Sequence, residues 1–335
     1  MATRPPAMRV EALKKHYQVR KGLAAIVGGG SELVRAVDGV DLTVRREEVL
    51  TVAGESGSGK TTLGKLMVKL LEPTSGRIIY NGEDITAIKG AKLAETRRRL
   101  QFIFQDPYES LNPRMTVYDL ISEGIRVHKM ATGRADEYDR VSRILERVGL
   151  TPVEDFMARF PHQLSGGQRQ RVAIARALVL EPEFVVADEP VSMLDVSIRA
   201  EILNLLLELK ERLALTMVFI THDLAVARHM SDRIAIMYLG KVVEVGSTED
   251  IIYNPLHPYT VALLKAVPDP DPDAGRSQVV VTGEMPSAIR PPPGCRFHTR
   301  CPIARRGKCD VEEPPLVEYS PGHYAACHFA GQFRP

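Results

Sequence analysis

Two glycine-bearing segments of this chain have the residue types of phosphate-binding sites. Residues 54–61 read Gly-Glu-Ser-Gly-Ser-Gly-Lys-Thr, and residues 164–168 read Leu-Ser-Gly-Gly-Gln. One nucleotide needs only one phosphate cradle. Two different cradles therefore predict that each serves a different side of a nucleotide and that two chains share the site.

The first segment has the strand–loop–helix context of a P-loop. An apolar, β-branched run at 49–53 precedes it, and apolar residues at helical spacing follow over 61–71. Glycines let the backbone N–H groups turn inward, and the helix N-terminus adds positive potential. Lys60 would reach the β- and γ-phosphates and Thr61 would ligate Mg²⁺. The residues expected to contact the nucleotide are Gly54, Ser56, Gly57, Ser58, Gly59, Lys60, Thr61 and Thr62.

Polar side chains also follow two other apolar runs that are typical of buried strands. Asp188 and Glu189 follow the run at 184–187, and His222 follows the run at 216–220. Adjacent side chains at a strand end point different ways, so we expect Asp188 to hold Mg²⁺ and Glu189 to polarise the attacking water. A solvated acidic turn is the alternative. Open α/β sheets bind ligands at this edge, which favours a γ-phosphate contact for His222.

Gln105 follows the apolar run at 101–104 and has an amide oxygen that can ligate Mg²⁺ or water; an ordinary turn is the open alternative. In the second cradle, Ser165 is a favoured N-cap for a helix that continues to about residue 180. Gly166 and Gly167 would expose backbone N–H groups beside Gln168, where the helix dipole favours phosphate. The alternative is a simple capped helix, although caps rarely need two glycines.

Together these motifs, in this order, resemble the ATP-binding cassette family over about residues 8–268. The resemblance implies an α/β fold, a P-loop ATPase with an inserted helical subdomain at about 110–182 that carries the signature. It implies that residues 165–168 cap ATP bound to a facing subunit and that Tyr17 stacks on adenine. It also implies that Asp195 belongs to a dimer-contact loop and that Gln105 couples ATP to a membrane partner.

A closer resemblance is to ATPase subunits of oligopeptide and dipeptide importers. It rests on Asn-Pro-Leu-His-Pro-Tyr-Thr at 254–260, on residues 105–114 and on the cysteine-bearing tail. The implied partners are a second, different cassette chain, two transmembrane permease subunits and an extracytoplasmic substrate-binding protein. Some relatives with this tail import oligosaccharides, so that substrate class stays open. A soluble ATPase acting on DNA or ribosomes is less favoured, because the sequence has one cassette and no sustained heptads.

Composition bears on partners and location. With 44 basic and 42 acidic residues, the net charge of +2 gives no reason to expect nucleic acid as a partner. No segment approaches the ~20 consecutive apolar residues that cross a bilayer. The N-terminal residues lack the apolar core of a signal peptide. We therefore expect a peripheral protein at the cytoplasmic face of the cell membrane.

A Pro/Asp run at 268–273 predicts a boundary between an ATP-binding domain at 1–268 and a C-terminal extension at 269–335. All four cysteines lie in this extension: Cys295, Cys301, Cys309 and Cys327. Disulfides are unusual in a cytosolic ATPase, so ligation of a metal by thiolates is favoured. The spacing is looser than that of common zinc pairs, which favours a 4Fe-4S cluster over zinc. Unliganded buried cysteines remain an alternative.

Overall fold

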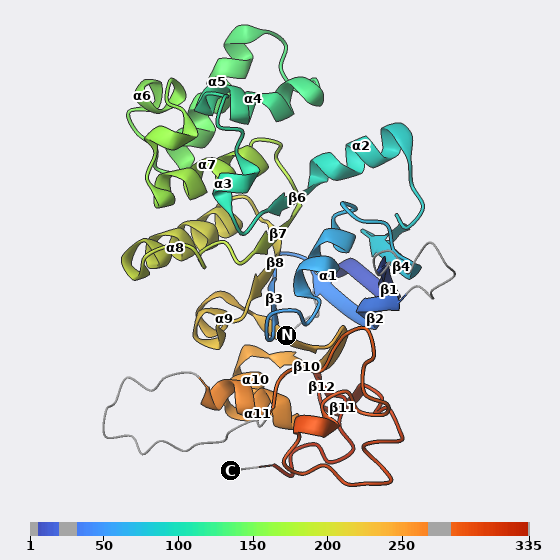
Figure 1. The fold of residues 1–335 in the computed structure, drawn as a ribbon. Helices are drawn as coiled ribbons and strands as arrows, with labels where there is room; N and C mark the ends of the chain where they lie inside the picture. Colours follow the sequence, from blue (N-terminus) through green and yellow to red (C-terminus); the bar gives the residue numbers. More distant parts are fainter. Residues whose placement is uncertain (1–5, 20–31, 267–282, 334–335) are drawn as a thin grey trace, which may run out of the picture.

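The computed structural model describes residues 6–19, 32–266 and 283–333, and the predicted linker at 268–273 lies outside them. The described residues form two sheets, with strand orders β2-β1-β4-β5 and β11-β12-β10-β9-β3-β8-β7-β6. Figure 1 shows the larger sheet running from a helical lobe, beside β6, to the C-terminal strands, beside β10.

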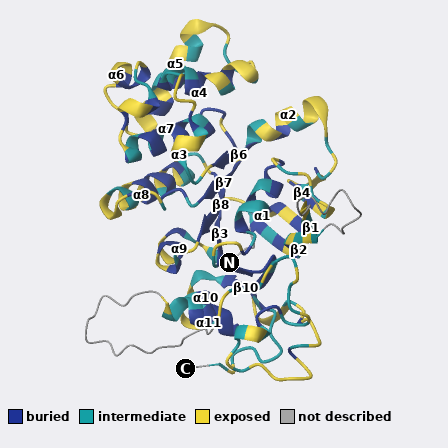
Figure 2. Cartoon of the chain, viewed as in Figure 1, coloured by how far each residue is buried: buried dark blue, intermediate teal, exposed yellow. Residues whose placement is uncertain are grey.

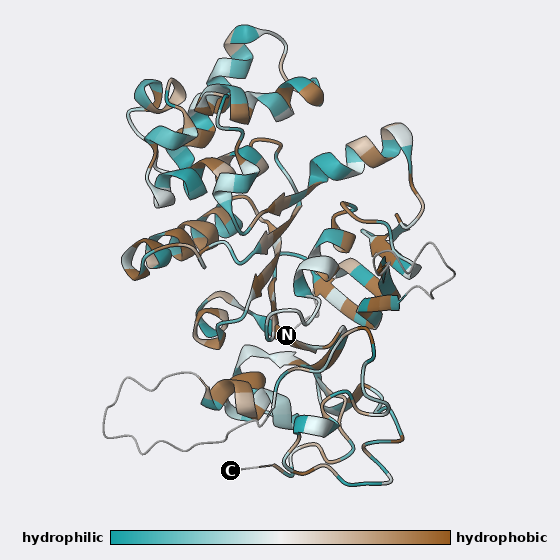
Figure 3. Cartoon of the chain, in the orientation of Figure 1, coloured by the Kyte–Doolittle hydropathy of each residue, from teal (hydrophilic) through white to brown (hydrophobic). Residues whose placement is uncertain are grey.

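The centre of the larger sheet is parallel. Its strands are β6 (Leu100–Ile103), β7 (Phe184–Asp188), β8 (Thr216–Thr221), β3 (Val49–Ala53) and β9 (Arg233–Tyr238). Alternate side chains enter two different cores: Val185 packs with the helical lobe, whereas Val186 packs with α1. Burial on both faces explains why these strands read as continuous apolar runs. Figure 2 shows them buried and Figure 3 shows them hydrophobic.

The smaller sheet is antiparallel. It contains β1 (Pro6–Val19), β2 (Glu32–Arg45), β4 (Ser75–Tyr80) and β5 (Glu83–Asp84). A tight turn at Asn81 and Gly82 joins β4 to β5, and both residues have positive φ angles, 48° and 84°. Its apolar residues share a core with α1 (Lys60–Met67). This sheet therefore places β1, with Tyr17, beside the P-loop helix.

Helix α1 ends earlier than the predicted run to residue 71. Lys69 adopts a left-handed backbone conformation (φ 57°), and its buried amine donates to Glu72 and to the Thr86 carbonyl. The other helices around the sheets are α2 (Gly90–Arg99), α8 (Val196–Arg212), α9 (Leu224–Met230), α10 (Thr248–Tyr253) and α11 (Pro258–Lys265). None of the helices in the described ranges is both long and apolar enough to cross a membrane.

The helical lobe is built from five α-helices and one 3₁₀ turn. These are α3 (Pro107–Ser110), α4 (Val117–Val127), α5 (Arg134–Arg147), α6 (Val153–Met157), η2 (Pro161–Gln163) and α7 (Gly166–Leu178). Helix α5 ends just before Gly149, which takes a left-handed conformation (φ 72°). The lobe matches the helical character expected for residues 110–182.

The C-terminal extension adds two strands to the edge of the larger sheet. β12 (His323–Ala325) pairs with β10 (Lys241–Ser247), and β11 (Val317–Ser320) pairs with β12. The buried His323 ring lies 2.8 Å from the Glu244 carboxylate on β10. The extension is thus attached to the same sheet that carries the P-loop.

Candidate nucleotide-binding site

The loop between β3 and α1 passes so close to neighbouring backbone that glycine is required at two positions. A Cβ on Gly54 would lie 2.2 Å from the Met237 carbonyl oxygen, and one on Gly59 would lie 2.0 Å from that of Ala36. Both glycines also have positive φ angles, 150° and 104°. The loop is therefore held between the end of β9 and strand β2.

Lys60 is buried at the start of α1. Its amine donates to the carbonyl oxygens of Gly54, at 2.8 Å, and Glu55, at 2.9 Å. Burial lowers the pKa of Lys60, while the negative charges of Glu189, Asp188 and Glu55 act in the opposite direction. The amine thus lies among the loop carbonyls and within the field of the acidic strand end.

Side chains from four sequence-distant segments meet at the C-terminal edge of the parallel strands. The Thr61 hydroxyl donates to Asp188 Oδ1 over 3.1 Å. Gln105 Nε2 donates to Glu189 Oε2 over 3.1 Å, and His222 Nδ1 lies 3.1 Å from Glu189 Oε1. The two adjacent carboxylates therefore have different partners.

Burial shapes the charge of this acidic pair. Desolvation raises the pKa of Asp188, the nearby Glu189 raises it further, and the hydrogen bond from Thr61 lowers it. Glu189 has a left-handed backbone (φ 43°), an uncommon conformation for a residue with a side chain. Its N–H donates to the Ile220 carbonyl, and its carbonyl accepts from the N–H and hydroxyl of Ser192. These bonds hold the strained residue in place.

A pocket of about 690 Å³ lies over the P-loop. Its lining includes these predicted site residues: Tyr17, Ser56, Gly57, Gly59, Lys60, Thr61, Thr62, Gln105, Glu189 and His222. The predicted residues Gly54, Ser58 and Asp188 are buried beside it. Sequence analysis missed Val34, Ala36, Glu55 and Leu263, which also line the pocket. Only Glu55 lies within a recognised motif. Val34 and Ala36 come from strand β2 and Leu263 comes from helix α11, and neither element carries a local signal of nucleotide binding.

The second cradle lies elsewhere in the chain. Ser165 Oγ accepts from the Gln168 N–H (3.3 Å), and Gln168 Oε1 accepts from the Ser165 N–H (3.0 Å), which is a capping box. Residues 165–168 are absent from the lining of the P-loop pocket. In Figure 1, α7 belongs to the helical lobe, apart from α1. The structure therefore does not bring the two cradles of one chain together.

Gly167 has a packing role that the sequence did not reveal. A Cβ at this position would lie 2.6 Å from Ile198 Cγ2 on α8, whereas one on Gly166 would make an ordinary contact. Asp195 precedes α8, and its carbonyl accepts from the Arg199 N–H at 2.8 Å. Its neighbours Met193 and Val196 are 65% and 79% exposed. The exposed apolar side chains of Met193 and Val196 thus lie beside the signature, residues 164–168.

Comparison with known proteins identifies the chain. The family model described as ABC transporter matches residues 37–192, and that described as oligopeptide/dipeptide transporter, C-terminal region, matches residues 243–309. A putative peptide import ATP-binding protein of Brucella ovis is 47% identical over 325 residues, covering 97% of this chain and 98% of the relative. The chain belongs to the ATP-binding cassette transporter family. The oligopeptide transport ATP-binding protein AppF of Bacillus subtilis is 46% identical over 330 residues, 98% of both chains.

Solved cassettes share the fold. The dimeric ATP-binding cassette MJ0796 in a post-hydrolysis state bound to ADP and Pi is 30% identical, with a TM-score of 0.63, and the match covers 72% of this chain and 98% of that one. CbiO1 of Clostridium perfringens has the same identity and TM-score, with coverages of 75% and 92%. The predicted P-loop ATPase fold is confirmed, and this cassette is an ATPase.

The four cysteines of the cassette's extension are free thiols, so none of them forms a disulfide. Burial raises the pKa of Cys295, Cys301 and Cys327 to about 11. The sulfur of Cys309 accepts the Arg305 N–H, at 3.4 Å. Four thiols suit iron or zinc chemically, yet within the described ranges no three His, Cys, Asp or Glu side chains form a group that could hold a metal ion. The geometry therefore gives no support to the predicted 4Fe-4S or zinc site.

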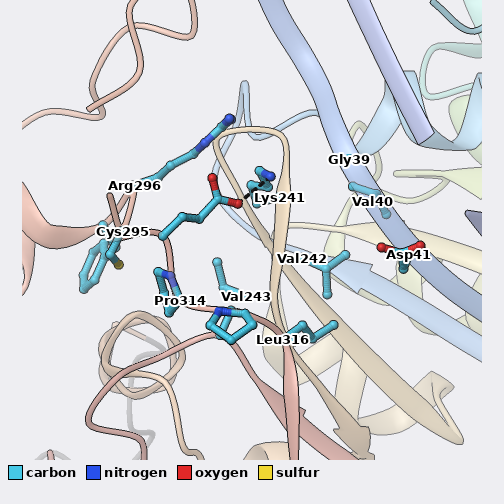
Figure 4. A pocket seen from close by; sticks show the side chains of 14 residues that line it. Gly39, Val40, Asp41, Lys241, Val242, Val243, Cys295, Arg296, Pro314 and Leu316 are labelled. Atoms are coloured by element: carbon cyan, nitrogen blue, oxygen red, sulfur yellow. Dashed lines mark ion pairs between the residues drawn. The ribbon is translucent and has the colours of Figure 1, made fainter. Parts of the chain in front are cut away.

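A smaller cavity of about 220 Å³ marks the junction between the cassette and its extension. Figure 4 shows Cys295, Arg296 and Pro314 on the extension side and Val242 and Val243 on β10. Lys241 and Glu313 form an ion pair of 2.6 Å across it. None of the predicted nucleotide-site residues is in the lining of this cavity, so we assign it to packing.

Proposed function

We propose that this cassette powers import of peptides through the cytoplasmic membrane by closing on ATP together with a second cassette. The observation that carries the proposal is the meeting of Lys60, the Thr61–Asp188 pair and the Gln105–Glu189–His222 cluster in one pocket. The peptide class rests on the relatives, which are named for peptide import, and on the match to the oligopeptide/dipeptide C-terminal region.

In this proposal the P-loop glycines and serines, with Thr62, surround the phosphates, Lys60 neutralises them, and Tyr17 stacks on adenine. Thr61, Asp188 and Gln105 offer oxygen donors, which suit Mg²⁺, and the ion would supply charge neutralisation to the phosphates. Glu189 polarises the attacking water, because its carboxylate is oriented by Gln105 and His222. His222, 58% exposed at the side chain, also faces the γ-phosphate.

The second cassette completes the site. Residues 165–168 of each chain would cap ATP held by the other chain's P-loop, since one chain keeps its own two cradles apart. The loop with Asp195 would lie at the contact, where Met193 and Val196 become covered. We propose a different cassette chain as the partner. ATP binding then closes the dimer and hydrolysis reopens it.

The permease subunits would bind the cassette in a groove next to Gln105. This groove, of about 400 Å³, lies between the parallel sheet and the helical lobe and is lined by residues of β6, α4 and α7. The apolar residues Leu70, Phe104 and Val127 are exposed on it, at 41%, 39% and 70%. A permease helix in this groove would sense movement of Gln105, whose amide contacts Glu189. An extracytoplasmic binding protein would deliver the solute.

Reconstitution tests the transported class. The cassette would be assembled with its partner cassette and permease subunits in vesicles, and ATP hydrolysis and uptake would be measured with binding protein loaded with peptides or with oligosaccharides. We expect peptides to stimulate both activities, and the Lys60→Ala complex to show neither. Stimulation by oligosaccharides alone would support the alternative substrate.

For the extension, we propose a distinct unit at 269–335 whose four cysteines hold a 4Fe-4S cluster, with zinc as the alternative. Support comes from the four free thiols and from the importer resemblance of the tail. Anaerobically purified protein should be brown, absorb near ~400 nm and contain iron and sulfide. Colourless protein with stoichiometric zinc would favour the alternative, and protein with neither would contradict both.

A further inference from the structure

An arginine of the extension reaches the P-loop. Arg300 ends the 3₁₀ turn η3 (His298–Arg300), directly before Cys301. Its Nη1 donates to both carboxylate oxygens of Glu55, each at 3.1 Å. The guanidinium also lies over the Tyr238 ring, and its side chain is only 9% exposed. The Glu55 side chain is 32% exposed, so Arg300 is the more shielded member of the pair.

Glu55 is held at every polar group of its residue. Its N–H donates to the Tyr259 hydroxyl at 2.9 Å. Its carbonyl accepts from the Lys60 amine at 2.9 Å and from the Ser58 N–H at 3.2 Å. Arg300 occupies its carboxylate. The loop conformation at Glu55 is thus held by contacts from the P-loop itself and from the C-terminal part of the chain.

The residues behind these contacts form one aromatic cluster. Tyr259 on α11 packs edge-on against Tyr238, with ring centroids 4.7 Å apart, and Phe297 packs against both, at 5.3 Å from each. Phe297 is buried and lies in the same short segment as Arg300. The cluster gives Arg300 and Tyr259 fixed positions from which to hold Glu55.

The same segment also contacts strand β2, which contributes to the lining of the pocket. Arg296 is buried and bonds to the Asp38 carboxylate and the Leu239 carbonyl. Asp38 lies 2.9 Å from the His16 ring, and His16 directly precedes Tyr17 on β1. Residues 295–301, with a cysteine at each end, therefore contact the P-loop and strand β2, whose Asp38 in turn contacts His16 next to Tyr17.

Charge explains why Glu55 needs this partner. Glu55 lines the pocket that also contains Lys60 and Thr61. A free carboxylate there would repel the phosphates of ATP and would attract the Lys60 amine away from them. The Arg300 guanidinium pairs with this carboxylate and compensates its charge.

We propose that Arg300 is a positioning residue for ATP binding, which neutralises and orients Glu55 so that the P-loop accepts the triphosphate. The inference rests on the proposed nucleotide site. It makes the extension part of the ATP-binding apparatus, and it predicts that ATP affinity depends on the segment between Cys295 and Cys301.

The test is a double-mutant cycle on the full chain, read out as the KM for ATP, kcat and thermal stability. Arg300→Gln should raise the KM for ATP about tenfold, because a carboxylate is left uncompensated beside the phosphates. Adding Glu55→Gln to that variant should return KM to within about threefold of wild type, since the charge has gone. Arg300→Lys, which keeps the charge, should lie between wild type and Arg300→Gln.

The matched control is Arg306→Gln, which removes an exposed arginine from the same extension and should leave KM unchanged. Arg300 has no positioning role if the KM of Arg300→Gln for ATP equals that of wild type, or if the raised KM persists unchanged in the double variant. Wild-type protein that binds no ATP would instead refute the proposed function. If Arg300→Gln fails to fold, the comparison of Arg300→Lys with and without Glu55→Gln carries the test.

Discussion

The P-loop (residues 54–61) and the signature (residues 164–168) are both phosphate-binding candidates, but they differ in what their residues contact. Around the P-loop, Asp188 bonds to Thr61 and Glu189 bonds to Gln105, and each of these pairs joins residues that follow different strands. At the signature, Ser165 and Gln168 bond to each other, and the nearby Val196 is exposed. One region is therefore assembled by the fold of its own chain, and the other is presented outward. The contrast favours a site completed by association.

The largest effect is expected from a substitution beside the P-loop. Glu189→Gln should lower kcat for ATP hydrolysis by at least about 10²-fold, because the amide cannot act as a base for water. ATP binding should be retained, so the variant should accumulate as a closed dimer in gel filtration with ATP. Turnover close to wild type would contradict the general-base role.

Lys60→Ala should weaken nucleotide binding next most strongly. Loss of the amine leaves the phosphates without their nearest cation, and we expect the Kd for ATP to rise by about tenfold or more. Titration with a fluorescent ATP analogue measures this change. Thr62→Ser, which keeps a hydroxyl in the same loop, is the control and should bind far more tightly than Lys60→Ala.

A substitution near the signature should weaken dimerisation of the cassette and leave its ATP affinity unchanged. Val196→Asp places a charge on the exposed apolar surface at the start of α8, where an acidic residue also suits the helix dipole. We expect the monomer fold and ATP affinity to be kept, and the ATP-dependent dimer of the Glu189→Gln background to weaken about tenfold. Val311→Asp, at a residue exposed to 66% in the extension, is the matched control and should leave the dimer intact.

A smaller effect, on the pH dependence of stability, is expected from His257, which lies next to the residues that contact the P-loop. Burial lowers the pKa of His257 to about 4, and its Nδ1 accepts the Tyr259 N–H at the start of α11. The unfolded chain takes up this proton near pH 6.5, so the contribution to stability is complete above that pH and is lost as the pH falls toward 4.

His257→Asn keeps an N-cap acceptor but does not titrate. Between pH 7 and pH 4.5 the wild type should therefore lose up to about 3 kcal/mol more unfolding free energy than the variant. Denaturant unfolding at several pH values measures the difference. Equal losses in both proteins would show that His257 does not govern the acid response of this region.

Much of the fold could be predicted from local patterns. The apolar runs at 49–53, 184–187 and 216–220 form parallel strands β3, β7 and β8, because buried strands need apolar residues on both faces. The glycines at 54 and 59, which the P-loop pattern contains, are explained by close approach of neighbouring backbone. Helix α1 is shorter than predicted because the buried Lys69 amine finds partners outside the helix.

Local patterns could not reveal contacts between distant segments. Gly167 fits a phosphate site in sequence, yet its lack of a side chain also admits Ile198 of α8. The cysteine spacing indicated a metal centre, but no metal-holding group is formed among the described residues. Leu263 reaches the P-loop pocket from α11 without any motif of its own.

By itself the sequence determined which chemical groups are present and which strand each one follows, since motif spacing and strand patterns are local properties of the chain. Only the tertiary structure decided that Arg300 of the extension occupies the carboxylate of Glu55 and that the two phosphate cradles of one chain stay apart. Strand order places the extension beside β10 and residues 165–168 beyond β6, and strand order depends on which surfaces pack together across the whole chain.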